Sequence, residues 1–119
     1  MEESAIIANK LYKRARIYCH GSDSYTRSAI MDVFGEMSNT VKKNHAMAFI
    51  LFSESAKLGN VEALCCIGCC YKKGYGCKCN EEYAIKWYQH AIEKGNLRAK
   101  DHLLSWAKDL YPKFRSTLV

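Results

Sequence analysis

One segment of this chain occurs twice, and the second copy follows the first at an offset of 36 residues. The first copy begins at Ala48 and the second at Ala84, and the pair Gly59-Asn60 returns as Gly95-Asn96. A period of this length is typical of helical repeat arrays, in which each repeat is one hairpin of helices. Such hairpins bury their apolar faces only by stacking on one another, so the chain is predicted to fold as a short helical array.

Glycine and asparagine residues divide the chain into segments of helical length. Gly59 and Gly95 suit the left-handed backbone position that ends a helix. Asn44 and Asn80 suit the position that caps the start of the next helix. We therefore predict an all-α chain of three helical hairpins, with helices at about 4–19, 25–38, 44–58, 61–73, 81–94 and 97–110.

Apolar residues recur at intervals of three and four along the predicted helices, as one buried helix face requires. Small alanines alternate with large aromatic residues, which lets neighbouring helices approach and interdigitate. In the two copies of the repeat this stripe consists of Ala48, Leu51, Phe52, Ser55 and Ala56, and then of Ala84, Trp87, Tyr88, Ala91 and Ile92. On the helices that follow each copy, it consists of Ala63, Ile67, Cys70 and Tyr71, and then of Ala99, Leu103 and Trp106.

The composition is that of one folded domain in a reducing compartment. The chain has 119 residues and begins without the basic region and apolar run of a secretory signal. It contains seven cysteines, an odd number that favours reduced thiols over a disulfide framework. We therefore expect a cytoplasmic protein.

The formal net charge of +6 raises the question of nucleic-acid binding. Lysines and arginines are spread along the whole chain among acidic residues, although Lys10, Lys13, Arg14 and Arg16 could share one helix face. We favour a solvated basic surface over a specific nucleic-acid site.

A long motif in the second half of the chain resembles the Sel-1-like repeat, a helical hairpin related to the tetratricopeptide class. The motif reads Ala63-x-x-x-Ile67-Gly68-x-x-Tyr71-x-x-Gly74-x-Gly76-Cys77-x-x-Asn80-x-x-x-Ala84-x-x-Trp87-Tyr88-x-x-Ala91-x-x-x-Gly95-Asn96-x-x-Ala99. Cys77 stands in place of the family's valine and Ile92 in place of its second alanine. The resemblance covers about 46–107 and implies a short right-handed α-α superhelix whose concave side binds protein partners.

This resemblance divides the chain into four segments. Residues 1–43 match the family poorly, because Ser38 and Thr40 replace both loop glycines; they are either a degenerate repeat or a non-repeat hairpin that caps the array. Residues 44–80 form a repeat, 81–111 form the C-terminal repeat and cap, and 112–119 form a tail. The open ends of so short an array favour a homodimer.

The cysteines allow an alternative function. Cys66-x-x-Cys69 and Cys77-x-Cys79 offer four thiolates, which zinc binds tetrahedrally, so a zinc-binding or redox-responsive domain is the second hypothesis. Cys66 and Cys69 fall within a predicted helix, away from the helix N-terminus that activates redox thiols. Cys77 takes an apolar family position, and free cysteine packs as a small hydrophobe. We favour packing.

The sequence offers no catalytic constellation. The four histidines lack a carboxylate or nucleophile at catalytic spacing, and the Gly74-x-Gly76 loop is explained by the repeat turn. We therefore expect an interaction adaptor or scaffold, with neither enzymatic activity nor a cofactor.

The resemblance implies that the first helix of each repeat lines the inner face, where partners bind. Ile50 is informative because its repeat equivalent is the charged Lys86: it is either an exposed contact or packs beneath the N-terminal hairpin. The predicted partner-binding residues are those that lie off the core stripe, namely Ile50, Ser53, Lys57, Lys86, Gln89, His90 and Glu93.

The last four residues resemble a ligand for PDZ domains, with Thr117 two positions before a terminal Val119. Such peptides add a strand to a sheet edge, and backbone amides capture the carboxylate. This motif is short and arises often by chance.

Overall fold

The computed structural model describes residues 2–21, 30 and 42–118, with side chains described as far as Ala107. The described chain is helical and contains no strand. Its helices are α1 (Glu2–His20), α3 (His45–Lys57), α4 (Val61–Lys73), α5 (Glu81–Glu93) and α6 (Leu97–Leu118). The predicted all-α class is confirmed, and four of the six predicted helices begin and end within two residues of those observed.

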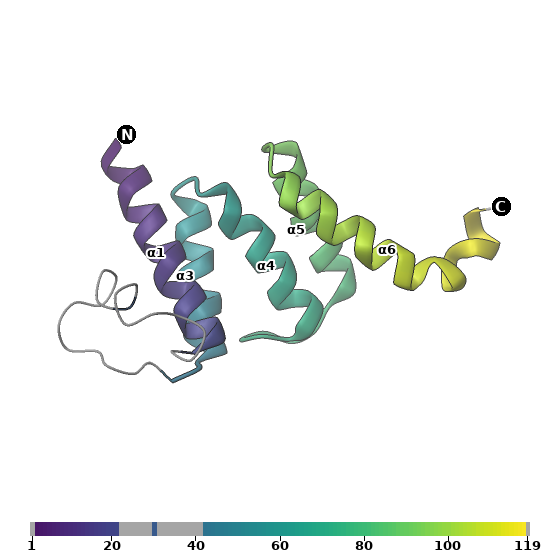
Figure 1. Cartoon of the computed structure of the whole chain (residues 1–119), viewed down its shortest axis with the longest axis horizontal. Coiled ribbons are helices and arrows are strands. Elements are labelled where there is room, and N and C mark those ends of the chain that lie inside the picture. The colour runs from purple at the N-terminus through teal and green to yellow at the C-terminus, as the bar shows by residue number, and fades with distance from the viewer. Residues whose placement is uncertain (1, 22–29, 31–41, 119) are drawn as a thin grey trace.

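The helices stack side by side in two layers (Figure 1). In the view of Figure 1, α1, α4 and α6 lie toward the viewer, and α3 and α5 lie behind them. α3 packs against α1 and α4, and α5 packs against α4 and α6, so each helix contacts its neighbours in the array. The result is an elongated α-α solenoid with extents of 57 × 32 × 22 Å.

Asparagine and glycine residues define the helix ends, as the repeat predicts. The side chains of Asn44, Asn60 and Asn80 each accept a hydrogen bond from the backbone N–H three residues later. Gly59 and Gly95 have φ values of +98° and +95°, the left-handed region in which a side chain would be strained. The local turn chemistry therefore fixes the same hairpin geometry twice.

Two adjoining clusters of buried side chains hold the layers together, and the predicted stripe supplies most of them. Phe52 is 2 % exposed in one cluster and its repeat equivalent Tyr88 is 1 % exposed in the other. Gly68 makes room for Tyr88, because a Cβ at Gly68 would lie 2.9 Å from two carbon atoms of the ring. The small residue is thus required by the close contact of α4 and α5.

The N-terminal helix is joined to the first complete repeat by hydrogen bonds as well as by apolar packing. The buried hydroxyl of Ser55 on α3 donates to the carbonyl of Ala8 on α1. The backbone N–H of Asn44 donates to the carbonyl of Tyr18 at 2.7 Å. The predicted helix at 25–38 lies outside the described residues except for Ile30, so whether residues 1–43 form a degenerate repeat stays a prediction.

The last helix is longer than the sequence indicates. The predicted end at 110 is wrong, because α6 continues to Leu118 and includes Pro112. No glycine follows Gly95 in the chain, so the usual left-handed stop is absent. Within the described ranges, no helix is both long enough and apolar enough to cross a membrane.

Candidate functional site

An open groove of about 410 Å³ crosses the surface where α4 and α5 approach α3. Tyr71 comes from the end of α4, and the other lining residues come from α5. On α5 they recur at spacings of three and four, so they share one side of the helix. The groove is lined by Tyr71, Tyr83, Lys86, Trp87 and His90.

Aromatic rings meet edge to face along this groove. Tyr71 and Tyr83 have ring centroids 5.4 Å apart with planes at 90°. On its other side, Tyr71 meets Phe49 of α3 at 5.5 Å and 88°. Edge-to-face pairs at these distances are favourable, so the three rings hold one another in place. The groove therefore has a preformed aromatic wall.

The predicted partner-binding residues of α5 divide between the groove and the surface beside it. Lys86 and His90 line the groove, and the Lys86 ammonium lies 5.7 Å from the centre of the Tyr83 ring. Gln89 and Glu93 are exposed outside it. His90 Nδ1 lies 3.9 Å from Glu93 Oε2, a distance at which an exposed ion pair contributes little.

The predicted residues of α3 do not line the groove. Ile50 is 50 % exposed, and Lys57 is exposed as well. Ser53 is half-buried, and its hydroxyl donates to the Phe49 carbonyl of its own helix at 2.9 Å. The structure therefore places Lys86 and His90 in the groove, whereas the predicted residues of α3 lie outside its lining.

Sequence reasoning assigned Tyr71 and Trp87 to the core and did not consider Tyr83. Both assigned residues are only half-buried. Tyr83 is 47 % exposed, and its repeat equivalent Met47 is 38 % exposed. The signal available was an apolar residue off the core stripe in both copies of the repeat, whereas Ile50 was singled out because its repeat equivalent is charged.

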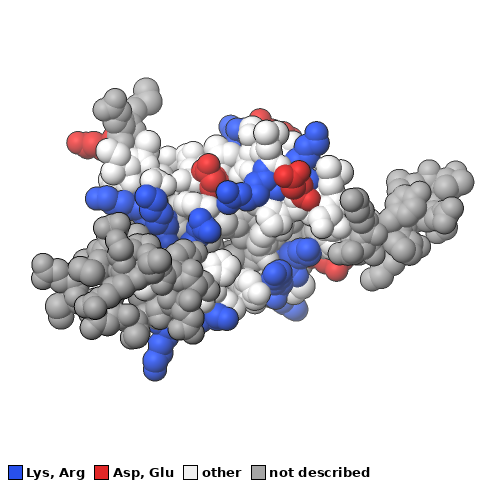
Figure 2. Space-filling model, viewed as in Figure 1, with Lys and Arg blue, Asp and Glu red and all other residues white. Residues whose placement is uncertain are grey.

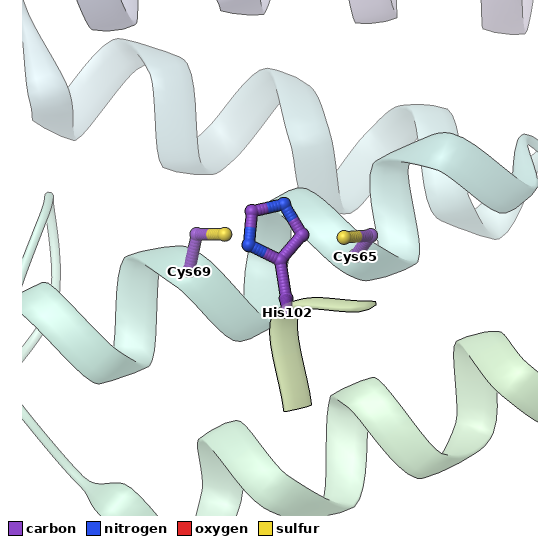
Figure 3. Close-up of side chains that lie close together, drawn as sticks. All are labelled: Cys65, Cys69 and His102. Atoms are coloured by element: carbon purple, nitrogen blue, oxygen red, sulfur yellow. The ribbon is translucent and has the colours of Figure 1, made fainter. Parts of the chain in front are cut away.

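A second cluster lies in the opposite layer, where Cys65 and Cys69 of α4 meet His102 of α6 (Figure 3). Of the four zinc ligands considered in the sequence analysis, only Cys69 belongs to this cluster. Cys77 donates to the Cys70 carbonyl at 3.5 Å and Cys79 to the Lys72 carbonyl at 3.1 Å, both in the loop region.

The two thiols of this cluster differ in acidity. The hydrogen bond that Cys65 donates to Cys69 raises the pKa of Cys65 and holds the pKa of Cys69 well below its ordinary value. The hydroxyl of Tyr88 donates to the Cys69 sulfur at 3.0 Å and acts in the same direction. Burial raises the pKa of the neighbouring Cys66 to about 12. Thiolate character is therefore concentrated at Cys69.

The positive charges do not gather into one patch on the face shown in Figure 2, where acidic side chains lie among the lysines and arginines. At the C-terminus, α6 includes residues 116–118, whereas a PDZ ligand binds as an extended strand. Val119 lies outside the described residues, so the PDZ contact stays a prediction.

Comparison with known protein families gives two matches in this chain. The model of the Sel1 repeat matches residues 33–60 and 61–96, which together make up more than half of the sequence. The second match spans α4, the connecting loop and α5, and the first extends into the N-terminal segment that resembles the repeat least. No solved structure matches the chain.

Proposed function

Because the chain belongs to the Sel1 repeat family, we propose that it is an interaction adaptor that binds a partner protein on the face formed by α3 and α5. This is the inner, concave face expected of such an array. Sel1 repeats commonly serve as protein-interaction modules, and the described residues include a groove on this face.

The observation that carries the proposal is the exposure of large apolar side chains at equivalent positions of both repeats. Met47 and Ile50 on α3 correspond to Tyr83 and Lys86 on α5, which border the groove. Three of these four are apolar and between 38 % and 50 % exposed. Apolar side chains left in water along one face are typical of a surface that a partner covers.

The chemistry of the groove indicates what kind of segment fits. Its aromatic wall suits a large apolar anchor, because tyrosine and tryptophan dominate the energetics of protein interfaces. Lys86 supplies positive charge in the groove for a carboxylate of the partner. We propose a partner segment with an apolar anchor flanked by an acidic residue. All seven cysteines are free thiols, which agrees with a cytoplasmic adaptor.

The test is affinity purification with quantitative mass spectrometry, followed by calorimetry with the purified partner. Ile50→Glu should weaken binding by at least about tenfold and leave Tm within roughly 2 °C of wild type, because an exposed residue contributes little to stability. Leu97→Glu is the matched control, since Leu97 is 76 % exposed on α6.

Two results would contradict the proposal. If Ile50→Glu lowers Tm by more than roughly 8 °C, Ile50 packs in the folded chain and the alternative interpretation holds. If Ile50→Glu and Tyr83→Ala both bind the partner as tightly as wild type does, the face of α3 and α5 is not the binding surface.

A further inference from the structure

Two sulfur atoms and an imidazole converge from two helices that are far apart in the sequence. The ligand atoms of Cys65, Cys69 and His102 all lie within 4.8 Å of one another. Figure 3 shows the imidazole ring between the two sulfur atoms. We propose that these three residues bind one zinc ion, with a fourth coordination position open to the cleft between α1, α4 and α6.

The backbone places the three donors at nearly the required separations. Cys65 and Cys69 are one helical turn apart on α4, so both side chains project from the same face. Tetrahedral zinc with bonds of about 2.3 Å to sulfur and 2.0 Å to nitrogen needs donor atoms about 3.5–3.8 Å apart. The observed separations, all within 4.8 Å, are close to these values.

The donor set selects the metal. Thiolate and imidazole are the ligands of zinc and related thiophilic ions, whereas magnesium and calcium require oxygen ligands. Two thiolates neutralise the charge of Zn²⁺, and the thiol protons pass to solvent when the ion binds. Two cysteines, one histidine and an open position make up a known arrangement of zinc ligands in proteins.

Tyr88 holds two of the three ligands in position. Its hydroxyl donates to the Cys69 sulfur at 3.0 Å, and its ring stacks on His102 with centroids 5.9 Å apart and planes at 10°. Tyr88 itself is 1 % exposed and cannot turn freely. Partners that orient the ligands in this way characterise protein metal sites.

The fourth position opens toward solvent. A cleft of about 240 Å³ includes all three proposed ligands in its lining. Its other charged residues are mainly basic, with Arg16, Lys73 and Arg98 against the single carboxylate of Glu62. A water molecule or a small anion therefore completes the coordination more readily than a protein side chain does.

A bound ion would tie α6 to α4 directly. His102 is exposed and belongs to the last helix of the array, which packs chiefly against α5. A ligand that binds only the folded state stabilises it by mass action. At free zinc concentrations about a hundredfold above Kd, we expect Tm to rise by on the order of 10 °C.

The experiment uses the full, untagged chain, reduced and stripped of metal with a chelator. Zinc content after equilibrium dialysis should reach one ion per chain, with a Kd below about 1 μM. Cobalt should give thiolate charge-transfer bands and the visible bands of a tetrahedral site. His102→Gln should weaken zinc binding at least roughly a hundredfold, and because His102 is exposed this variant should still fold.

Matched controls separate this site from general thiol or imidazole binding. Cys79→Ser removes an exposed thiol outside the cluster, and His90→Gln removes an exposed imidazole in the other layer. Both should bind zinc as wild type does. Fewer than about 0.1 zinc ions per reduced chain, or an equal loss in a control variant, would overturn the proposal. Because the groove is a separate surface, loss of metal binding leaves the adaptor proposal untouched.

Discussion

Adding one methyl group at Gly68 tests how closely α4 and α5 must pack. A Cβ at this position would lie 2.9 Å from the Cδ1 and Cε1 atoms of Tyr88 and 3.2 Å from its Cγ. Ordinary carbon contacts lie at about 3.5–4.0 Å, so the substitution Gly68→Ala forces a buried ring to move. These three atoms belong to the rigid ring of Tyr88, which cannot bend out of the contact as a flexible side-chain end could.

Two opposing effects set the magnitude. Alanine is favoured over glycine within a helix by about 1 kcal/mol. Overpacking of a buried site costs about 1–3 kcal/mol. Tyr88 is 1 % exposed and held by its hydrogen bond to Cys69, so the steric cost should lie toward the upper end. We expect Gly68→Ala to lower the free energy of unfolding by about 1–2 kcal/mol, a Tm decrease of roughly 3–10 °C.

Thermal and urea unfolding followed by circular dichroism measure this change. The comparison that isolates the cause repeats Gly68→Ala in a Tyr88→Leu background, where the ring is gone. There the helix propensity of alanine should dominate, and the same substitution should become neutral or stabilising. A Tm that is unchanged or higher in the wild-type background, or an equal loss in both, refutes the argument from close packing.

Two further predictions concern a helix end and a thiol. Asn80→Ala should lower the free energy of unfolding by about 1 kcal/mol, because it removes the acceptor for the Tyr83 N–H. Asn80→Ser keeps a capping oxygen and should retain most of the stability. Urea unfolding measures both variants, and equal losses would contradict the capping role. Tyr88→Phe removes a donor that stabilises the Cys69 thiolate, so the pKa of Cys69 should rise and its alkylation by iodoacetamide at pH 7 in chelator should slow. Peptide mapping measures this rate, Tyr83→Phe is the control, and an unchanged rate for Tyr88→Phe would show that the bond has no effect on acidity.

The sequence predicted the repeat well because its signals are local. Asn44 and Asn80 cap the helices that they were expected to cap. The helix predicted at 61–73 is observed at Val61–Lys73. Caps, left-handed glycines and apolar spacing act within a few residues, so they can be read from the chain directly.

The candidate sites were predicted less completely. Ile50 is exposed and Lys86 and His90 line the groove, but their role in partner binding stays a prediction, and the aromatic wall of the groove was missed. Tyr71 is a family core position, and repeat logic alone does not reveal that it stays half-buried. Its exposure depends on how far apart α3 and α5 lie.

The cysteines also show the difference between what local sequence patterns predict and what depends on helix packing. Spacing along the chain grouped Cys66 with Cys69, because Cys-x-x-Cys is a familiar pair of zinc ligands. Cys65, one turn before Cys69, lies on the same side of α4 as well, and the hairpin of α5 and α6 brings His102 beside Cys65 and Cys69. No local pattern links a residue of α4 to one of α6 across an intervening helix.

The sequence by itself therefore determined the described helices, their ends apart from that of α6, most of their buried faces and the family to which the chain belongs. The tertiary structure decided which side chains meet across the array, both in the groove and around Cys69. The reason is physical: helix formation depends on neighbours within one or two turns, whereas contacts between stacked helices depend on side-chain volumes summed over the whole interface. Gly68 illustrates both kinds of effect: it is part of the repeat motif in the sequence, and its lack of a side chain leaves room for the Tyr88 ring in the fold.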